Sequence, residues 1–120
     1  MKKRTDPRHI KRVKLMQQLF AWDFNHKEKA DEILEIIKKL RLIDKLIQKA
    51  APQRPLADIN KIDLAILRLS IFELIMVKGT PFKVVVDEAV ELGKEYGGES
   101  SAGFINGVLG KVIENKGLAV

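Results

Sequence analysis

The sequence predicts a compact all-α domain, and three observations lead to this prediction. Apolar residues recur at helical spacing along most of the chain, and no alternating strand pattern is sustained. The four prolines stand only at the expected starts of helices or in connectors, where a missing N–H is tolerated. A length of 120 residues suits one domain over residues 1–120, with a modest core and about five helices.

The first expected helix begins at Pro7, with Asp6 as its N-cap. Residues 1–7 are expected to form a flexible basic terminus. The helix starts half solvated and becomes apolar nearly all round, so its second half is expected to lie between two packing layers. One of its faces carries Ile10, Val13, Gln17, Phe20 and Phe24.

The second expected helix runs from about residue 31 to residue 50. Isoleucine and leucine side chains trace a single stripe along it. Acidic residues stand in its first turn and lysines in its last, which matches the helix dipole. Pro52 and Pro55 end it and form a short connector.

The third expected helix, from about residue 58 to residue 77, is the most buried candidate. From Ile62 onward, apolar side chains cover nearly its full circumference. Its charged residues, which include Asp63 and Arg68, are costly inside a protein unless they are paired or reach the surface. Gly79 is its expected C-cap.

The last two helices follow from their turn residues. Thr80 is expected to cap the fourth helix, which continues with helical period to the Gly97-Gly98 pair. Ser100 or Ser101 is expected to cap the fifth helix. Three glycines in this helix lower its intrinsic stability and suggest close packing against a neighbour, and they are Gly103, Gly107 and Gly110.

Several classes of function are excluded by composition. The chain has no cysteine and only two histidines, so neither thiol chemistry nor an ordinary zinc site is expected. No apolar run is long enough to cross a membrane, and the amino terminus lacks the apolar region of a signal peptide, so a cytoplasmic protein is expected. The Asp87-Glu88 pair points in two directions on a helix, so the two carboxylates are expected to be solvated or favoured by the helix dipole rather than to share a substrate. We therefore expect no enzyme, no cofactor and no metal site.

The distribution of charge points to a polyanionic partner. Residues 1–14 hold seven basic side chains and one acidic side chain. Their net charge therefore equals the formal net charge of +6 of the whole protein. Such a cationic end attracts nucleic acid through long-range forces and counterion release. The alternative is a solubilising tail without a partner. Arg8, Lys11 and Arg12 are the expected phosphate-binding ridge, while Phe20, Tyr96 and Phe104 could stack on bases or belong to the core.

Three blocks, in the same order and spacing, resemble the NusB family and cover about half the chain. The first is residues 62–74, with its AILR core and aromatic-Glu-Leu ending. The second is residues 80–92, which contain PFKVVVDEAVEL, and the third is FINGVL at residues 104–109. The stretch from Arg8 to Trp22 is also similar to the arginine-rich opening helix of that family.

The resemblance implies a particular fold. Members of the family consist of two small helical bundles that share the long amino-terminal region, with about five to six helices expected here. The stretch between Trp22 and Ile62 is about one helix shorter than usual, so the first bundle is expected to be shortened. The Asn106-Gly107 pair is expected to pack around the neighbouring helix.

The resemblance also implies a function. Together with the ribosomal protein NusE, such a protein binds the boxA element of nascent single-stranded RNA. The complex then joins the elongating RNA polymerase and suppresses termination, notably in ribosomal RNA operons. By position, Asp63 and Arg68 match the region that faces NusE. The expected RNA-binding residues are Arg4, Arg8, His9, Lys11, Arg12, Phe20, Lys83, Tyr96 and Phe104.

Some departures and alternatives accompany this reading. His9-Ile10 stands where the family often has two arginines, and Gly93 and Gly110 replace other usual residues. A similar RNA-binding domain occurs in some ribosomal RNA cytosine methyltransferases. That activity needs a large α/β domain, so this alternative fails if 120 residues is the natural length and returns if the reading frame is longer. A third alternative is a protein-interaction module, with a homodimer formed through the Leu15, Leu19 and Trp22 stripe.

Overall fold

The computed structural model describes residues 6–27 and 30–117, in which all regular secondary structure is helical. This confirms the predicted fold class. Arg4 and the other residues ahead of Asp6 lie outside the described residues. The elements are α1 (Pro7–Phe24), η1 (Asp31–Ile33), α2 (Leu34–Lys38), α3 (Leu40–Ala50), η2 (Leu56–Asp58), α4 (Lys61–Met76), α5 (Phe82–Tyr96) and α6 (Ser101–Asn115).

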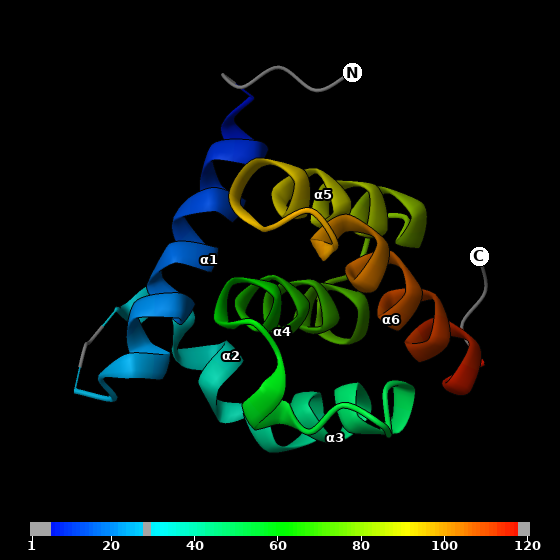
Figure 1. Cartoon of the computed structure of the whole chain (residues 1–120). Coiled ribbons are helices and arrows are strands. Elements are labelled where there is room, and N and C mark those ends of the chain that lie inside the picture. The colour runs from blue at the N-terminus through cyan, green and yellow to red at the C-terminus, as the bar shows by residue number, and fades with distance from the viewer. Residues whose placement is uncertain (1–5, 28–29, 118–120) are drawn as a thin grey trace.

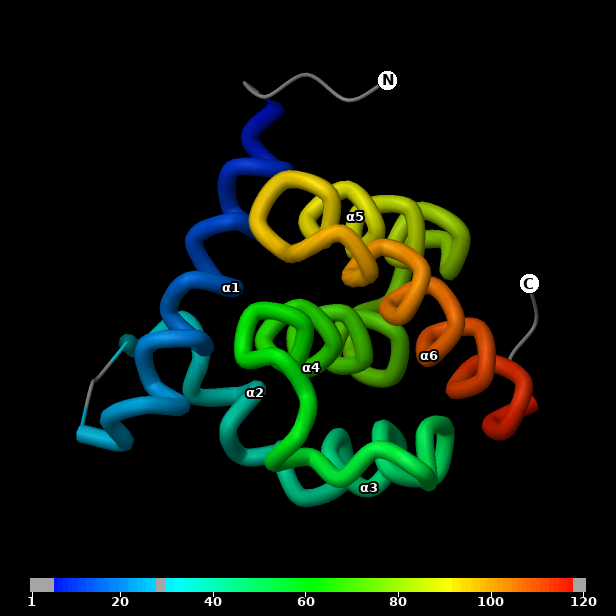
Figure 2. The backbone as a smooth tube through the Cα atoms, viewed as in Figure 1, coloured from blue at the N-terminus to red at the C-terminus, as the bar shows by residue number. Residues whose placement is uncertain are grey.

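Helix α4 is the centre of the molecule. Figure 1 shows α1, α5, α6 and α3 arranged around it, and the backbone tube in Figure 2 shows the same enclosure. Nine consecutive α4 residues, from Asp63 to Ile71, are buried, and Leu74 is buried as well. The buried apolar side chains form one core cluster around this helix. Helix α4 therefore contacts helices from both the amino-terminal and the carboxy-terminal parts of the chain.

Helix α1 begins as predicted but buries a different face. The Asp6 carboxylate accepts a hydrogen bond from the Arg8 N–H at 2.8 Å, so Asp6 is the N-cap. The fully buried residues of α1 are His9, Met16 and Leu19. The expected apolar face lies at the edge of this contact, because Ile10 is 52% exposed and Phe24 is 64% exposed.

The single helix expected over residues 31–50 is divided into three elements. Lys39, between α2 and α3, has φ −100° and ψ 6° and leaves the helical path. Its N–H still donates to the Ile36 carbonyl at 3.0 Å, so the break is a tight turn rather than a loop. The bend allows Ile36 of α2 and Ile43 of α3 both to enter the core. No proline or glycine marks this break in the sequence.

The ends of α4 and the start of α5 differ slightly from the prediction. Helix α4 begins at Lys61, because the Asn60 side chain accepts from the N–H groups of Ile62 and Asp63. It ends at Met76, so Gly79, with φ +95°, belongs to the connector rather than to the C-cap. Pro81, not Thr80, stands at the N-cap of α5.

The glycines of α6 do not pack closely. A Cβ atom at Gly103, Gly107 or Gly110 would meet no other atom within 4 Å among the described residues. Asn106 is also exposed, so the expected packing of the Asn106-Gly107 pair is wrong. These residues form an open face of α6.

Within the described ranges, no helix is both long enough and apolar enough to span a membrane.

The turn between α5 and α6 does require a glycine at one position. A Cβ at Gly97 would overlap the Ser101 side chain and lie 2.8 Å from the Gly93 carbonyl oxygen. The Ser101 hydroxyl accepts a hydrogen bond from the Gly98 N–H at 2.9 Å, so it is held in place. Ser101 is thus the first residue of α6 and binds the turn, while Ser100 is the N-cap without a side-chain bond.

We expect Gly97→Ala to destabilise the protein by about 1–3 kcal/mol, because the added methyl group forces the turn apart. Chemical denaturation of the variant and the parent measures this difference. Gly98→Ala is the matched control, since a Cβ at that position meets nothing within 4 Å among the described residues. Equal losses in both variants would contradict the steric explanation.

Candidate nucleic-acid interface

Arg12 does not lie on an open ridge. Its guanidinium binds the Glu73 carboxylate at 2.8 Å and 3.0 Å and the Glu88 carboxylate at 3.0 Å. The Arg12 side chain is only 12% exposed. The hydrogen bonds to Glu73 are the largest cause that raises the pKa of Arg12, and they outweigh the loss of hydration. Arg12 therefore joins α1 to α4 and α5 and is largely enclosed, and its role in a phosphate-binding ridge stays a prediction.

His9 is enclosed as well. Its ring lies between two carboxylates of α5, with Nε2 3.2 Å from Glu95 Oε1 and Nδ1 3.7 Å from Glu88 Oε2. The His9 side chain is only 6% exposed. His9 and Arg12 both point towards α5, one helical turn apart. They fix the orientation of the first turns of α1 rather than present charge to solvent.

Arg8 and Lys11 are the described members of the predicted ridge that remain open. The Arg8 side chain is 85% exposed, and its nearest carboxylate is the N-cap Asp6 at 3.7 Å. Lys11, three residues along the helix, is also exposed. The two residues border a groove between α1, α2 and α4, whose floor includes Leu15 and Phe72. The structure thus brings two exposed cations and apolar surface together, in a groove that Glu32, Glu35 and Glu73 also line.

The α5 candidates lie apart from each other. Lys83 is in the first turn of α5 and Tyr96 is its last residue, so about 20 Å of helix separates them. The Lys83 side chain is 81% exposed and lies 3.7 Å from Asp87. Tyr96 is 40% exposed. Both side chains are accessible, but one RNA nucleotide cannot reach both.

Phe20 and Phe104 are half-buried and have aromatic or cationic neighbours. The Phe20 ring packs edge-on against the Phe24 ring, with centroids 4.9 Å apart. The Arg54 guanidinium lies over the Phe104 ring, with Cζ 4.5 Å from the centroid. Both phenylalanines pack against the core on one side, so each belongs partly to the core and partly to the surface.

Neither residue expected to face NusE presents an open charge. Asp63 is 5% exposed, and its Oδ1 has no hydrogen-bond partner within the described part of the chain. Its position in the first turn of α4 places the carboxylate near the positive end of the helix dipole. Arg68 is 7% exposed and binds Asp44 and Asp23. The partner role of both residues stays a prediction.

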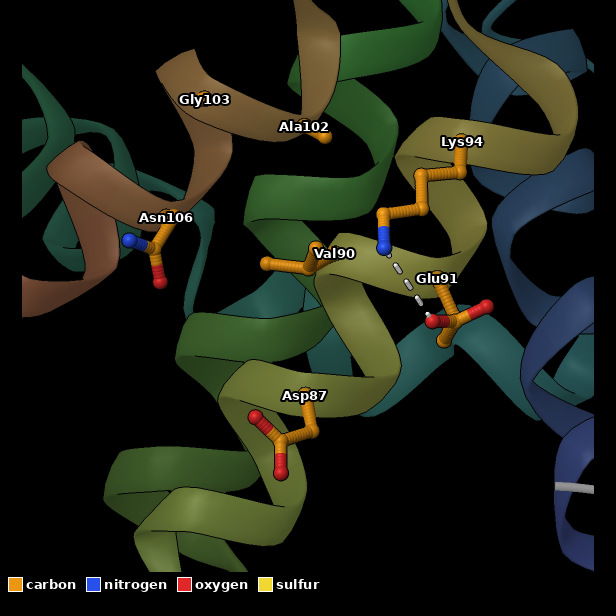
Figure 3. A pocket seen from close by; sticks show the side chains of 7 residues that line it. All are labelled: Asp87, Val90, Glu91, Lys94, Ala102, Gly103 and Asn106. Carbon is orange, nitrogen blue, oxygen red and sulfur yellow. Dashed lines mark ion pairs between the residues drawn. The ribbon is translucent and has the colours of Figure 1, made fainter. Parts of the chain in front are cut away.

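The Asp87-Glu88 pair diverges, as the helical geometry predicts, but the two residues are not both solvated. Asp87 is exposed, whereas Glu88 is 3% exposed and binds Arg12. Figure 3 shows Asp87 and Glu91 beside a groove between α5 and α6, with Lys94 3.6 Å from Glu91. The acidic rim of this groove does not suit a polyanion.

Arg54 and the carboxylate partners of Arg12 were missed by sequence reasoning. Glu73 and Glu88 stand 61 and 76 positions from Arg12, so no local pattern indicated their pairing. Arg54 lies in a short connector with no periodicity. Its signal was a lone arginine between Pro52 and Pro55, which on its own does not distinguish a binding residue from a solvated one. Within the described residues, no group of three or more possible metal ligands occurs.

The fold and the site together define a class of protein. This is a small all-helical domain with a basic amino-terminal opening, in which some cations fix the helices and others remain accessible. The chain belongs to the NusB family, whose family model matches residues 25–114.

Named relatives and solved structures agree with this assignment. The transcription antitermination protein NusB of Acetivibrio thermocellus is 43% identical over 101 residues, which cover 82% of this chain and 70% of the relative. That of Alkaliphilus oremlandii is 43% identical over 84 residues, covering 70% of this chain and 61% of the relative. In the relative from Chloroflexus aggregans, the match spans only 49% of the protein. These relatives carry the name of a transcription factor rather than of an enzyme.

The structural comparisons cover nearly the whole chain. The solved structure of T. maritima NusB superposes with a TM-score of 0.82 at 30% identity, covering 95% of this chain and 93% of that one. A chain in a structure described as "Crystal Structure of a Plectonemic RNA Supercoil" gives a TM-score of 0.77 at 21% identity, covering 94% and 98%. The second likeness shows the fold alone.

Proposed function

We propose that this protein is an RNA-binding transcription antitermination factor. With NusE, it binds boxA-type single-stranded RNA in nascent ribosomal transcripts and joins the elongating RNA polymerase complex in the cytoplasm. The observation that carries the proposal is the 43% identity to proteins named for transcription antitermination, over 82% of this chain in one case. Because the match spans only part of the length of those relatives, the activity of the whole relatives is proposed for this chain.

The accessible cations support the RNA-binding part of this proposal. Arg8 and Lys11 lie on the open side of α1, where a phosphate backbone can reach them without displacing an internal carboxylate. Each phosphate that a cation neutralises releases condensed counterions and favours binding. Exposed Tyr96 and half-buried Phe20 offer aromatic surface for stacking.

The roles within the proposed site differ between residues. Arg8, Lys11, Lys83 and Tyr96 are proposed to contact the RNA directly, with Arg4 as a further cation outside the described residues. His9 and Arg12 are proposed to act through the orientation of α1, because their side chains are enclosed. Asp63 and Arg68 are proposed to shape the NusE-facing region rather than to offer free charges.

Fluorescence anisotropy with a labelled boxA-like single-stranded RNA and a scrambled control tests the proposal. The measurement is made with and without NusE and at two salt concentrations. Selective binding that tightens with NusE and weakens with salt supports the proposed function. Equal binding to both RNAs, or binding that ignores salt, contradicts it. The latter result would favour a protein-interaction module, such as a homodimer.

We expect Arg8→Ala combined with Lys11→Ala to weaken RNA binding about tenfold or more at low salt. The slope of log affinity against log salt should become shallower by about 0.7 for each lost single-strand phosphate contact. Arg41→Ala with Lys45→Ala on α3 is the matched control, because it removes the same charge from another exposed helix face. Equal losses in the two double variants would mean that net charge, not the α1 surface, determines binding.

A further inference from the structure

An arginine from the first half of the chain covers an aromatic ring from the last helix. Arg54 lies in the connector between α3 and η2, and Phe104 lies in the first turns of α6. The Arg54 guanidinium carbon is 4.5 Å from the Phe104 ring centroid, within the range of a cation–π contact. Arg54 is exposed while Phe104 is half-buried, so the guanidinium forms the outer layer of this pair.

The connector holds Arg54 in place. Its backbone N–H donates to the Ala51 carbonyl at 3.1 Å, and its own carbonyl accepts from Gln48 Nε2 at 2.7 Å. Pro52 and Pro55 restrict the backbone on either side. The backbone and the ring together fix the position of the Arg54 side chain, which lowers the entropic cost of ordering this side chain when a ligand binds.

The hydrogen-bonding capacity of Arg54 is still available. Arg12 and Arg68 each bind two carboxylates inside the protein. Arg54, in contrast, forms no ion pair with any residue in the described ranges 6–27 and 30–117. A planar guanidinium with free N–H donors matches the geometry of a phosphate group.

We propose that Arg54 binds a phosphate of the single-stranded RNA, and that Phe104 holds the guanidinium in position for this contact. The proposal rests on the proposed function and extends the RNA-binding surface from α1 to the α3–η2 connector and α6. The face of Phe104 that Arg54 covers is not available to a base. At this place, the RNA therefore contacts the arginine rather than the phenylalanine ring.

The affinity of Arg54→Gln for the labelled boxA-like RNA tests this assignment. We expect a loss of about fivefold to tenfold at low salt and a salt slope that is shallower by about 0.7. Arg41→Gln is the matched control, because it makes the same change on an exposed arginine near the other end of α3. Arg54→Lys should recover part of the loss, since it restores the charge without the planar fork.

The possible outcomes separate this inference from the function on which it rests. No selective binding by the unchanged chain overturns the proposed function and this inference with it. Selective binding by the unchanged chain, with Arg54→Gln equal to Arg41→Gln, overturns the Arg54 assignment alone.

Phe104→Leu tests the supporting role of the ring. We expect it to weaken binding in the parent chain but to have no further effect in the Arg54→Gln background. Equal effects in both backgrounds would show that Phe104 meets the RNA itself, which would overturn its role as a support. Thermal unfolding of each variant confirms that the comparison is made on folded protein.

Discussion

Arg12→Ala is expected to destabilise the protein by about 3–5 kcal/mol, because it leaves two enclosed carboxylates without their common partner. Glu88 is 3% exposed, and the Glu73 side chain is only 13% exposed. Both carboxylates bind the Arg12 guanidinium at 3.0 Å or less. Urea denaturation of the variant and the parent measures the loss. A change in midpoint with an unchanged slope would show that stability, not compactness, has changed.

Two controls distinguish this structural role from an RNA contact. Arg8→Ala removes an exposed cation one helical turn away and is expected to change stability little. Arg12→Lys keeps the charge but loses the fork that binds two carboxylates, so its stability should lie between those of the parent and Arg12→Ala. If Arg12→Ala were as stable as the parent and had lost only RNA binding, Arg12 would contact the RNA and its assignment here would be wrong.

The buried face of α1 was predicted wrongly, and the reason shows what the sequence can predict. Counting apolar residues selected the stripe that contains Ile10 and Phe24, which is partly exposed. The face that packs against α4 and α5 instead carries His9 and Arg12 among its apolar residues. These polar side chains can be buried because their partners lie on helices distant in sequence. Local periodicity predicts that a helix exists, but it does not show which charges find partners.

Other elements followed more directly from local chemistry. Asp6 ahead of Pro7 predicted the start of α1 correctly, because an N-cap is satisfied within its own turn. The break at Lys39 had no such local signal, since it serves the packing of Ile36 and Ile43. The exposed glycines of α6 gave a local signal that was misleading. Their number suggested close packing, although the space around them is open.

The candidate site was predicted in the same uneven way. The cationic opening and its exposed members Arg8 and Lys11 follow from composition alone. Arg54 did not, because its significance depends on the Phe104 ring, which reaches it only through the packing of α6 against α3. Residues whose role depends on a tertiary neighbour require the fold.

Arg68→Met is expected to destabilise the protein by about 3 kcal/mol, because Arg68 ties three helices together. Its guanidinium binds Asp44 of α3 through two bonds of 3.0 Å and Asp23 of α1 at 3.2 Å. Burial alone would lower the pKa of Arg68, but the hydrogen bonds and charge of Asp44, followed by those of Asp23, raise it. Methionine fills similar space and leaves both carboxylates without this cation.

The same cluster should make stability depend on acidity. Burial tends to raise the pKa of Asp23, but hydrogen bonds and charges from Lys61 and Arg68 outweigh this effect and lower it. A carboxyl group with a lowered pKa in the folded state stabilises the protein above its unfolded pKa, near pH 4, and loses this contribution as the pH falls further. Stability should therefore fall below about pH 4, and it should fall less steeply in Asp23→Asn.

The stability and the NusE binding of Arg68→Met together decide what Arg68 does. Asp63→Asn is the comparison, because Asp63 lies on the same helix and has an unpaired Oδ1 within the described residues. If Arg68→Met unfolds readily while Asp63→Asn stays folded and loses NusE binding, the partner surface centres on the start of α4. If Arg68→Met stays as stable as the parent and loses NusE binding, Arg68 contacts the partner directly. In that case, the ion pairs of Arg68 with Asp44 and Asp23 would form only in the protein without its partner, and they would not be the reason why Arg68 is buried.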